Sequence, residues 1–226
     1  MYDYWFTQFD FPDENGKPYR SSGGAMVWND QLKRDIPLGW NVKTVADIIN
    51  VSNEKISPKD ISDRYYVPIE VIPRRCISFC ETASKDKALT GLCAFDKNAI
   101  LLSNRRVYFH KVSIAPFNGV TRDTVIILKP KIIENLGFAF QVINDDHFIE
   151  YATKNSYGTE QPVLATSTVL EYLIPYSSNQ LDLLYSQSVQ PMIDKVLQLQ
   201  NENHKLIALR DWLLPMLMNG QTTISD

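Results

Sequence analysis

One long stretch near the C-terminus, residues 189–218, constrains the fold of this chain more than any other feature. Its apolar residues recur at alternating spacings of four and three, the heptad pattern of a coiled-coil seam rather than the broad stripe of a globular helix. Gly220 follows the last apolar residue, where helices commonly end in a left-handed cap. So narrow a stripe requires a second helix to cover it. The predicted heptad seam consists of Met192, Val196, Leu199, Asn203, Leu206, Arg210 and Leu213.

Three residues of this stretch depart from an ideal apolar helix. Asn203 and Arg210 interrupt the seam, and polar residues there fix the register of paired helices at some cost in stability. Pro215 removes a backbone donor, so we expect the helix to bend near Leu214.

The composition is that of a chain with a sizeable core. It has 226 residues, of which 44 % are hydrophobic, enough for one large or two small units. No apolar run reaches bilayer length and the first residues do not form a signal peptide, so we expect a cytoplasmic protein without membrane contact. Cys76, Cys80 and Cys93 match no zinc-site spacing, and we expect them to be buried, reduced thiols.

Charge is distributed unevenly along the chain. The overall net charge is −3, which excludes a polyanion-binding protein by composition alone. Residues 64–131, however, hold 12 Lys and Arg against 5 Asp and Glu, a local net charge of +7, and the remainder of the chain carries −10. This uneven distribution of charge predicts one basic face on an acidic protein.

The N-terminal segment, residues 1–35, is dominated by aromatic side chains. Six of the ten residues from Tyr2 to Phe11 are aromatic, and a turn follows them. They could stack on nucleic-acid bases, but no lysine or arginine precedes Lys17, which favours packing against a core or a helix. Residues 21–24 are expected to form a flexible hinge, and residues 28–33 a short helix.

The central part, residues 36–177, reads as an α+β domain with a mixed or antiparallel sheet, because short apolar runs outnumber helical patterns without regular alternation. Expected strands are 40–44, 65–69, 76–79, 99–102, 107–114, 124–128 and 163–165. Expected helices are 44–49, 131–142, 145–151 and 167–172, with Asp145 and Asp146 favouring a helix N-terminus.

Three polar stretches carry the chemistry expected of a DNA-binding surface. The tip of residues 103–106 offers arginine forks that fit guanine or phosphate, although a solvated hairpin explains it equally well. Asn118-Gly119 predicts a hairpin turn followed by two phosphate-reaching residues, one of which Asp123 could instead bind. Residues 155–162 form a polar loop that could also be a purely structural turn. The candidate DNA-binding residues are Ser103, Asn104, Arg105, Arg106, Lys111, Thr121, Arg122, Tyr157, Thr159 and Gln161.

Catalytic and cofactor motifs are missing from the sequence. It contains no phosphate-binding glycine loop, no dinucleotide-binding glycine pattern and no zinc-protease motif. His110, His147 and His204 are scattered, and no nucleophile lies in a recognised context. We therefore expect a protein that is not an enzyme, with no metal site and no cofactor of its own.

Four segments together resemble the DNA specificity (S) subunit of type I restriction–modification enzymes. Residues 2–12 are similar to the segment that follows the central spacer helix of that family, and residues 36–40 to the entry of a target recognition domain. Residues 156–162 resemble a Gly-Thr-x-x-Pro turn late in that domain. Residues 209–220, Leu-Arg-Asp-Trp-Leu-Leu-Pro-Met-Leu-Met-Asn-Gly, resemble the end of the C-terminal spacer helix. These segments occur in the family's order.

The resemblance implies a fold and a set of partners. A complete S subunit has two target recognition domains separated by two helices that pair antiparallel, and each domain reads half of a split DNA target. S-adenosylmethionine and catalysis belong to the methyltransferase (M) subunits, and cleavage belongs to the restriction (R) subunit. This chain resembles the C-terminal half, with one recognition domain at 36–177, a spacer helix at 178–220 and a tail at 221–226.

Two functional hypotheses follow from these features. The first is sequence-specific recognition of double-stranded DNA within a methyltransferase complex. The alternative is an assembly protein that does not bind DNA and uses its C-terminal helix for coiled-coil association. In either case, two copies pairing their helices antiparallel would form a homodimer that imitates a complete S subunit.

Overall fold

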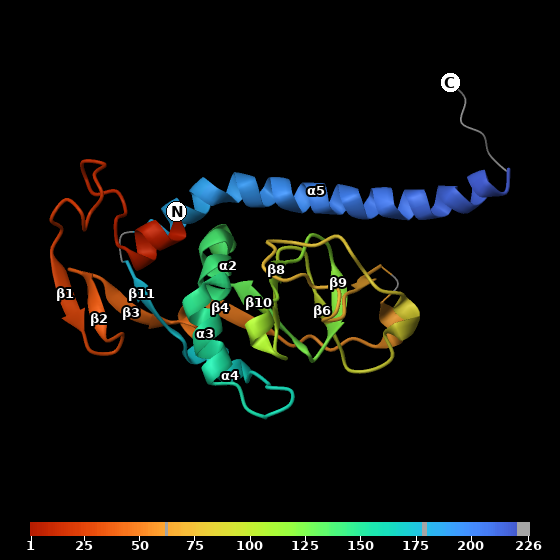
Figure 1. The fold of residues 1–226 in the computed structure, drawn as a ribbon, viewed down its shortest axis with the longest axis horizontal. Coiled ribbons are helices and arrows are strands. Elements are labelled where there is room, and N and C mark those ends of the chain that lie inside the picture. The colour runs from red at the N-terminus through yellow and green to blue at the C-terminus, as the bar shows by residue number, and fades with distance from the viewer. Residues whose placement is uncertain (62, 178–179, 221–226) are drawn as a thin grey trace, which may run out of the picture.

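The computed structural model describes residues 1–61, 63–177 and 180–220; the predicted tail, 221–226, lies outside the described residues. A strand-rich domain occupies most of the chain, and one long helix, α5 (Leu181–Met218), runs along one side of it (Figure 1). This arrangement confirms the predicted fold class of an α+β domain followed by a long C-terminal helix.

The centre of the domain is a four-stranded antiparallel sheet in the order β4 (Ile49–Ser52), β10 (Val125–Pro130), β7 (Ile100–Ser103) and β8 (Val112–Ile114). Both faces of the sheet are buried. Ile100 and Leu102 of β7 belong to the core on one face, whereas Leu101 belongs to the core on the other. Because successive strand residues alternate between faces, an unbroken apolar run fits a strand covered on both sides.

Three smaller sheets surround this centre. One holds β5 (Tyr65–Tyr66), β9 (Gly119–Arg122) and β6 (Leu92–Phe95), and the other two pair β1 (Met26–Asn29) with β2 (Arg34–Pro37) and β3 (Asn41–Thr44) with β11 (Leu173–Tyr176). Gly119 lies inside β9 rather than in the predicted hairpin turn. A Cβ there would come within 2.7 Å of the Tyr65 carbonyl oxygen, so the close approach of the strands requires glycine.

Helices cover the core face that includes Ile100. These are α1 (Val45–Ile48), α2 (Leu136–Asn144), α3 (Asp146–Lys154) and α4 (Thr166–Glu171). Short 3-10 turns lie elsewhere in the domain at η2 (Pro58–Asp60), η3 (Lys85–Lys87), η4 (Val107–Phe109) and η5 (Ile133–Asn135). Asp145 caps α3 as predicted, since its carboxylate accepts a hydrogen bond from the backbone N–H of His147 at 2.8 Å.

Several predicted elements are wrong. Residues 28–33 belong to the β1–β2 hairpin instead of a helix, and residues 163–165 make only isolated bridges. Residues 76–79 run beside β8 without forming a strand, because one backbone bond, from Ile114 to Ile77, and two serine hydroxyls replace a regular ladder. Residues 107–114 begin as η4 and become a strand only at Val112, since Arg106 and His110 adopt left-handed backbone conformations.

The N-terminal aromatic segment packs into the domain. It forms a short helix, η1 (Asp3–Thr7), and the buried Phe6 ring lies 4.9 Å from Phe138 and 5.6 Å from Tyr185, between centroids. The expected hinge is held in place, because Ser21 donates hydrogen bonds from its backbone N–H and its hydroxyl to the Asp10 carboxylate. Packing, not an open stacking surface, is therefore the role of most of these rings.

Helix α5 begins eight residues before residue 189, within the spacer helix predicted at 178–220, and continues through Pro191 and Pro215 to Met218 (Figure 1). Pro215 therefore does not end the helix, and the expected bend near Leu214 stays a prediction. The carbonyl that Pro215 leaves without its usual donor belongs to Asp211, an exposed residue that water reaches. The loss of this one hydrogen bond does not break the helix.

The first half of α5 is fixed against α2 and its neighbours. Leu181, Tyr185, Ile193 and Leu197 are buried there, and the Ser186 hydroxyl accepts a hydrogen bond from the Phe138 backbone N–H at 3.0 Å. Gly137 of α2 makes this approach possible, because a Cβ at that position would lie 2.5 Å from a methyl group of Val189.

Replacing Phe6 by alanine should lower the free energy of unfolding by about 3–5 kcal/mol, because it opens a cavity between α2 and α5. Replacing Tyr4, which is exposed on the same short helix, should change it by less than about 0.5 kcal/mol. Chemical denaturation of the two variants measures the difference. Equal effects of the two changes would contradict the packing role of Phe6.

Stability should fall at alkaline pH. Burial raises the pKa of Tyr185 to about 12, whereas tyrosine in the unfolded chain ionises near about pH 10. Above that pH the unfolded chain binds fewer protons than the folded one, so the free energy of unfolding is constant below about pH 10 and decreases as the pH approaches 12. Tyr185→Phe should make this decline shallower in thermal denaturation, while Tyr4→Phe should keep the slope of the unaltered chain.

Candidate DNA interface

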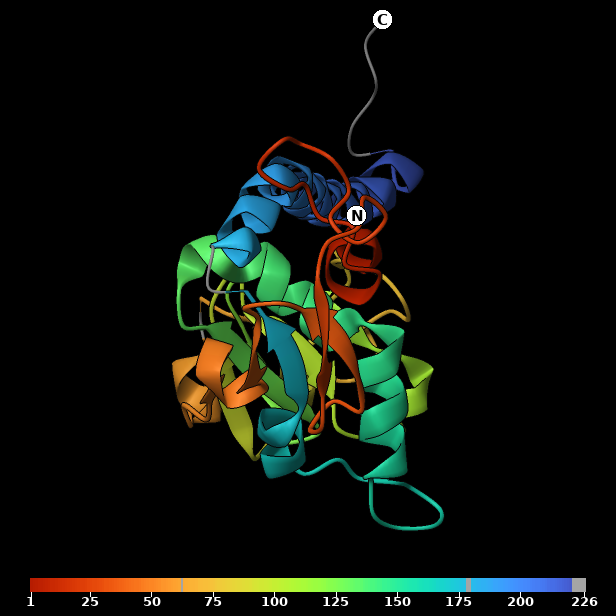
Figure 2. The ribbon, with the colours of Figure 1, turned by 90° about the vertical axis from the view of Figure 1, so that its left-hand side faces the viewer.

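Two of the polar stretches predicted from the sequence meet at the end of β7. The backbone of residues 104–106 runs antiparallel to residues 162–164, with hydrogen bonds from Leu164 N–H to the Asn104 carbonyl (2.8 Å) and from Arg106 N–H to the Pro162 carbonyl (3.0 Å). Tyr157 pairs with Val163 on the other side through two backbone hydrogen bonds. The loop that follows α3 hangs from the side of the domain opposite α5 in both views (Figures 1 and 2).

This pairing orients the side chains at the tip. Arg105, Val163 and Tyr157 lie directly opposite one another, and directly opposed residues in a ladder place their side chains on the same face. The Tyr157 ring is 63 % exposed, and Thr159 and Gln161 are exposed in the turn that follows. A cation and an aromatic ring therefore share one solvent-facing surface.

The two arginines at the tip are not neutralised by the protein. Within the part of the chain that the structure describes, neither the Arg105 nor the Arg106 guanidinium makes a hydrogen bond or an ion pair. Arg64 and Arg75, by contrast, bind the carboxylates of Asp96 and Asp146. Unpaired guanidinium groups on a protruding tip fit an anionic partner.

The 3-10 turn η4 and the arginine packed on it add two residues, Tyr108 and Arg74, that are not among the DNA-binding candidates predicted from the sequence. The Tyr108 ring is 49 % exposed, and the guanidinium carbon of Arg74 lies 3.9 Å from the centroid of the neighbouring Phe109 ring. The sequence offered a weak signal, an aromatic pair directly after two arginines, but the run resembled a strand and gave no reason to expect Tyr108 on the surface.

Two of the predicted contact residues are buried, and three more are partly exposed but have side chains bound to backbone carbonyls. Ser103 is buried and its hydroxyl donates to the Arg105 carbonyl at 2.7 Å, and Thr121 is fully buried in β9, so we withdraw both from the interface. The Asn104 side-chain amide donates to the Asp123 carbonyl at 2.7 Å and serves the turn instead of a base edge.

The remaining two are cations bound by carbonyl groups. Lys111 donates to the carbonyl of Ile69 at 2.7 Å, and its burial lowers its pKa. Arg122 donates to the carbonyl of Lys87 at 3.0 Å rather than binding Asp123. The sequence could not show this, because backbone carbonyls from distant loops hold both side chains.

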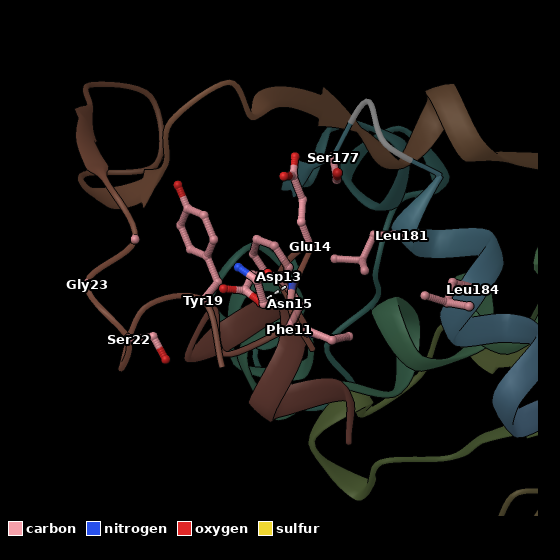
Figure 3. A pocket seen from close by; sticks show the side chains of 12 residues that line it. Phe11, Asp13, Glu14, Asn15, Tyr19, Ser22, Gly23, Ser177, Leu181 and Leu184 are labelled. Atoms are coloured by element: carbon pink, nitrogen blue, oxygen red, sulfur yellow. Dashed lines mark hydrogen bonds between the residues drawn. The ribbon is translucent and has the colours of Figure 1, made fainter. Parts of the chain in front are cut away.

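Other candidate sites offer less. A cavity of about 580 Å³ lies between the N-terminal segment and the first turns of α5, and Asp13 and Glu14 face it together with Leu181 and Leu184 (Figure 3). Among the described residues that line it there is no lysine or arginine, so it does not suit phosphate.

The thiol, metal and membrane predictions have separate outcomes. All three cysteines are free thiols, but Cys76 is exposed, which contradicts its predicted burial. Over the described ranges, no group of three or more His, Cys, Asp or Glu side chains is placed to hold a metal ion. No helix in those ranges has the length and apolar character needed to span a bilayer.

Comparisons with known proteins match this architecture. The family described as type I restriction modification DNA specificity domain matches residues 37–181. The type I restriction enzyme MjaIX specificity subunit of Methanocaldococcus jannaschii is 21 % identical over 248 residues, which cover 100 % of this chain and 52 % of that protein. This chain thus spans about half the length of that curated relative.

Two solved structures are similar. The HsdS subunit from Thermoanaerobacter tengcongensis superposes with a TM-score of 0.54 and 16 % identity, over 81 % of this chain and 48 % of that one, and shows the same fold. The type I restriction–modification S subunit from M. genitalium gives a TM-score of 0.47 and 15 % identity, over 79 % and 45 % of the two chains. On the family match, the chain belongs to the type I restriction–modification DNA specificity domain family.

Proposed function

We propose that this chain recognises a sequence in double-stranded DNA as the specificity subunit, or half-subunit, of a type I restriction–modification complex. The observation that carries the proposal is the tip at the end of β7, where Arg105 and Arg106 have no carboxylate partner among the described residues and Tyr157 is exposed beside them. Phosphate contacts from such cations position a protein on DNA, and base-edge contacts specify the sequence.

The proposed interface comprises the exposed residues of the tip and of η4. It keeps Thr159 and Gln161 from the sequence prediction and adds Tyr108 of η4 and Arg74, whose guanidinium packs on the Phe109 ring of the same turn. The proposed partners are methyltransferase (M) subunits, which would bind S-adenosylmethionine and perform catalysis, and a restriction (R) subunit, which would cleave. In this proposal the chain itself is not an enzyme, needs no cofactor and acts in the cytoplasm.

Replacing Arg105 and Arg106 together by alanine should weaken binding to short duplex DNA by at least about 30-fold, because each lost charged contact contributes about 1–3 kcal/mol. The dependence of affinity on salt should also become shallower, by about one unit of logarithmic slope for each phosphate contact removed. Fluorescence anisotropy of the full chain across a salt series measures both quantities.

A control with the same loss of charge is Lys97→Ala combined with Lys131→Ala. Both lysines are exposed and lie at the other end of the β7–β10 pair, since Ile100 pairs with Leu128 and Ser103 with Val125. The control should keep nearly the affinity of the unaltered chain. If both double variants lose affinity equally, or neither does, the tip is not the DNA-binding surface.

The second part of the proposal concerns the heptad seam of α5. Met192, Leu199 and Leu206 expose 61 %, 44 % and 60 % of their surfaces, while Ile193 and Leu197 face the domain and are buried. An apolar seam beside a docked face supports antiparallel pairing with another helix, and we propose that a second copy supplies it in the absence of a first spacer helix. An assembly protein that does not bind DNA would use the same seam. The Arg105 and Arg106 double variant distinguishes the two hypotheses, because it lowers DNA affinity only if the chain binds DNA.

Replacing Leu199 or Leu206 by aspartate should weaken self-association by at least about tenfold, because it puts a charge into an apolar interface. Analytical ultracentrifugation over a concentration series measures the change. Gln198→Asp places the same charge on the exposed polar back of the helix and should leave association unchanged. An unaltered chain that stays monomeric at high concentration would contradict the proposed homodimer.

A further inference from the structure

His110 is a buried side chain directly behind the proposed DNA-binding tip. Its ring is 3 % exposed, and it ends the 3-10 turn η4 in a left-handed conformation with φ of 53°. The Nε2 atom lies 3.0 Å from both the backbone oxygen and the side-chain Oδ1 of Asn144. The Nδ1 atom lies 3.3 Å from Oδ1 of Asp146.

These contacts decide which nitrogen atoms carry protons. The backbone oxygen of Asn144 can only accept, so Nε2 must donate. In the neutral ring Nδ1 would then present a lone pair to the Asp146 carboxylate, and Nδ1 makes no aligned hydrogen bond among the described residues. Only the imidazolium, with a proton on each nitrogen, interacts favourably on both sides at once.

The charges around the ring come from several elements. The Asp146 carboxylate also accepts a hydrogen bond from Arg75 at 2.9 Å, and that bond lowers the pKa of Asp146, so the carboxylate facing His110 is ionised at neutral pH. The adjoining cavity, of about 370 Å³, is also faced by Asp3, Asp145 and His147. Three acids, one arginine and a second histidine therefore surround the imidazole.

The position of the His110 ring determines the conformation of η4, the turn that follows the tip. Helix η4 is a single turn, bounded by Arg106 at its start and His110 at its end, and Phe109 N–H donates to the Arg106 carbonyl at 2.9 Å. Both boundary residues are left-handed, a conformation that is unfavourable for a residue other than glycine. Such a turn keeps its conformation only where surrounding residues stabilise it, and the contacts of the His110 side chain stabilise one end of η4.

We propose that His110 is a positioning residue, which, bound between Asn144 and Asp146, holds η4 so that Arg106 and Tyr108 face DNA. The inference rests on the proposed function of the tip. It predicts that loss of the His110 contacts weakens DNA binding through the loss of the Arg106 contact, so that the salt dependence of binding becomes shallower as well.

The test is His110→Asn, because asparagine tolerates a left-handed backbone but cannot become charged. Binding of the full chain to a pool of short random-sequence duplexes at low ionic strength should weaken by at least about fivefold. The salt dependence of binding should become shallower than that of the unaltered chain, because Arg106 no longer faces a phosphate. The matched control is His147→Asn, which changes an exposed histidine at the same helix start and should keep both the affinity and the salt dependence.

A second pair of variants covers the case in which His110→Asn does not fold. Asp146→Asn removes the carboxylate that faces Nδ1 and should also weaken binding and make its salt dependence shallower. Arg75→Gln breaks the ion pair between Arg75 and Asp146 but leaves the carboxylate beside His110, and should keep the affinity and the salt dependence. If the tip-arginine double variant loses DNA binding while His110→Asn and Asp146→Asn keep the affinity and salt dependence of the unaltered chain, the inference on His110 is wrong and the proposed DNA interface stands. If the tip arginines are also without effect, the proposed interface fails with it.

Discussion

A buried carboxylate at the start of α5 determines how the helix sits on the domain. Asp182 is 4 % exposed and accepts hydrogen bonds from the Asn135 side chain at 2.7 Å and from the Tyr176 hydroxyl at 2.8 Å. A buried charge without such donors costs several kcal/mol, so the helix cannot rotate about its axis without a large penalty. Because successive residues are 100° apart, fixing Asp182 toward the domain also fixes which side of the helix faces solvent. The exposure of Met192, Leu199 and Leu206 follows from that rotation.

The second half of α5 has its own attachment to the domain. The His204 Nδ1 atom lies 2.8 Å from the Cys80 carbonyl oxygen, and its ring centroid lies 4.5 Å from that of Tyr65 and 5.1 Å from that of Phe117. With Asp182 near one end and His204 more than twenty residues later, the helix is held at two separated points, and its last turns extend beyond the domain (Figure 1). A helix held in this way transmits its orientation to the domain.

The sequence predicted the parts of this structure that depend on local pattern. The heptad spacing predicted a long helix, and turn residues around the tip and around residues 155–162 predicted two exposed loops. It failed where distant contacts decide the conformation. Arg106 and His110 are left-handed because residues far apart in the chain hold η4, and no periodicity separates that turn from a strand of Val, Tyr and Phe. Thr121 read as an exposed polar residue because its burial depends on a sheet whose partners, β5 and β6, lie up to about fifty residues away in sequence.

The two proposed interfaces lie on opposite sides of the domain. The loop of residues 155–162 hangs from the side away from α5 (Figures 1 and 2), and the backbone of residues 104–106 is joined to it. Helix pairing would bury Leu199 and Leu206 without approaching Arg105, so a paired chain keeps its tip free for DNA. The order of contacts then follows from electrostatics. The uncompensated cations of the tip attract the duplex over a longer range than the heptad seam, whose one cation, Arg210, is paired with Asp211, attracts a second helix.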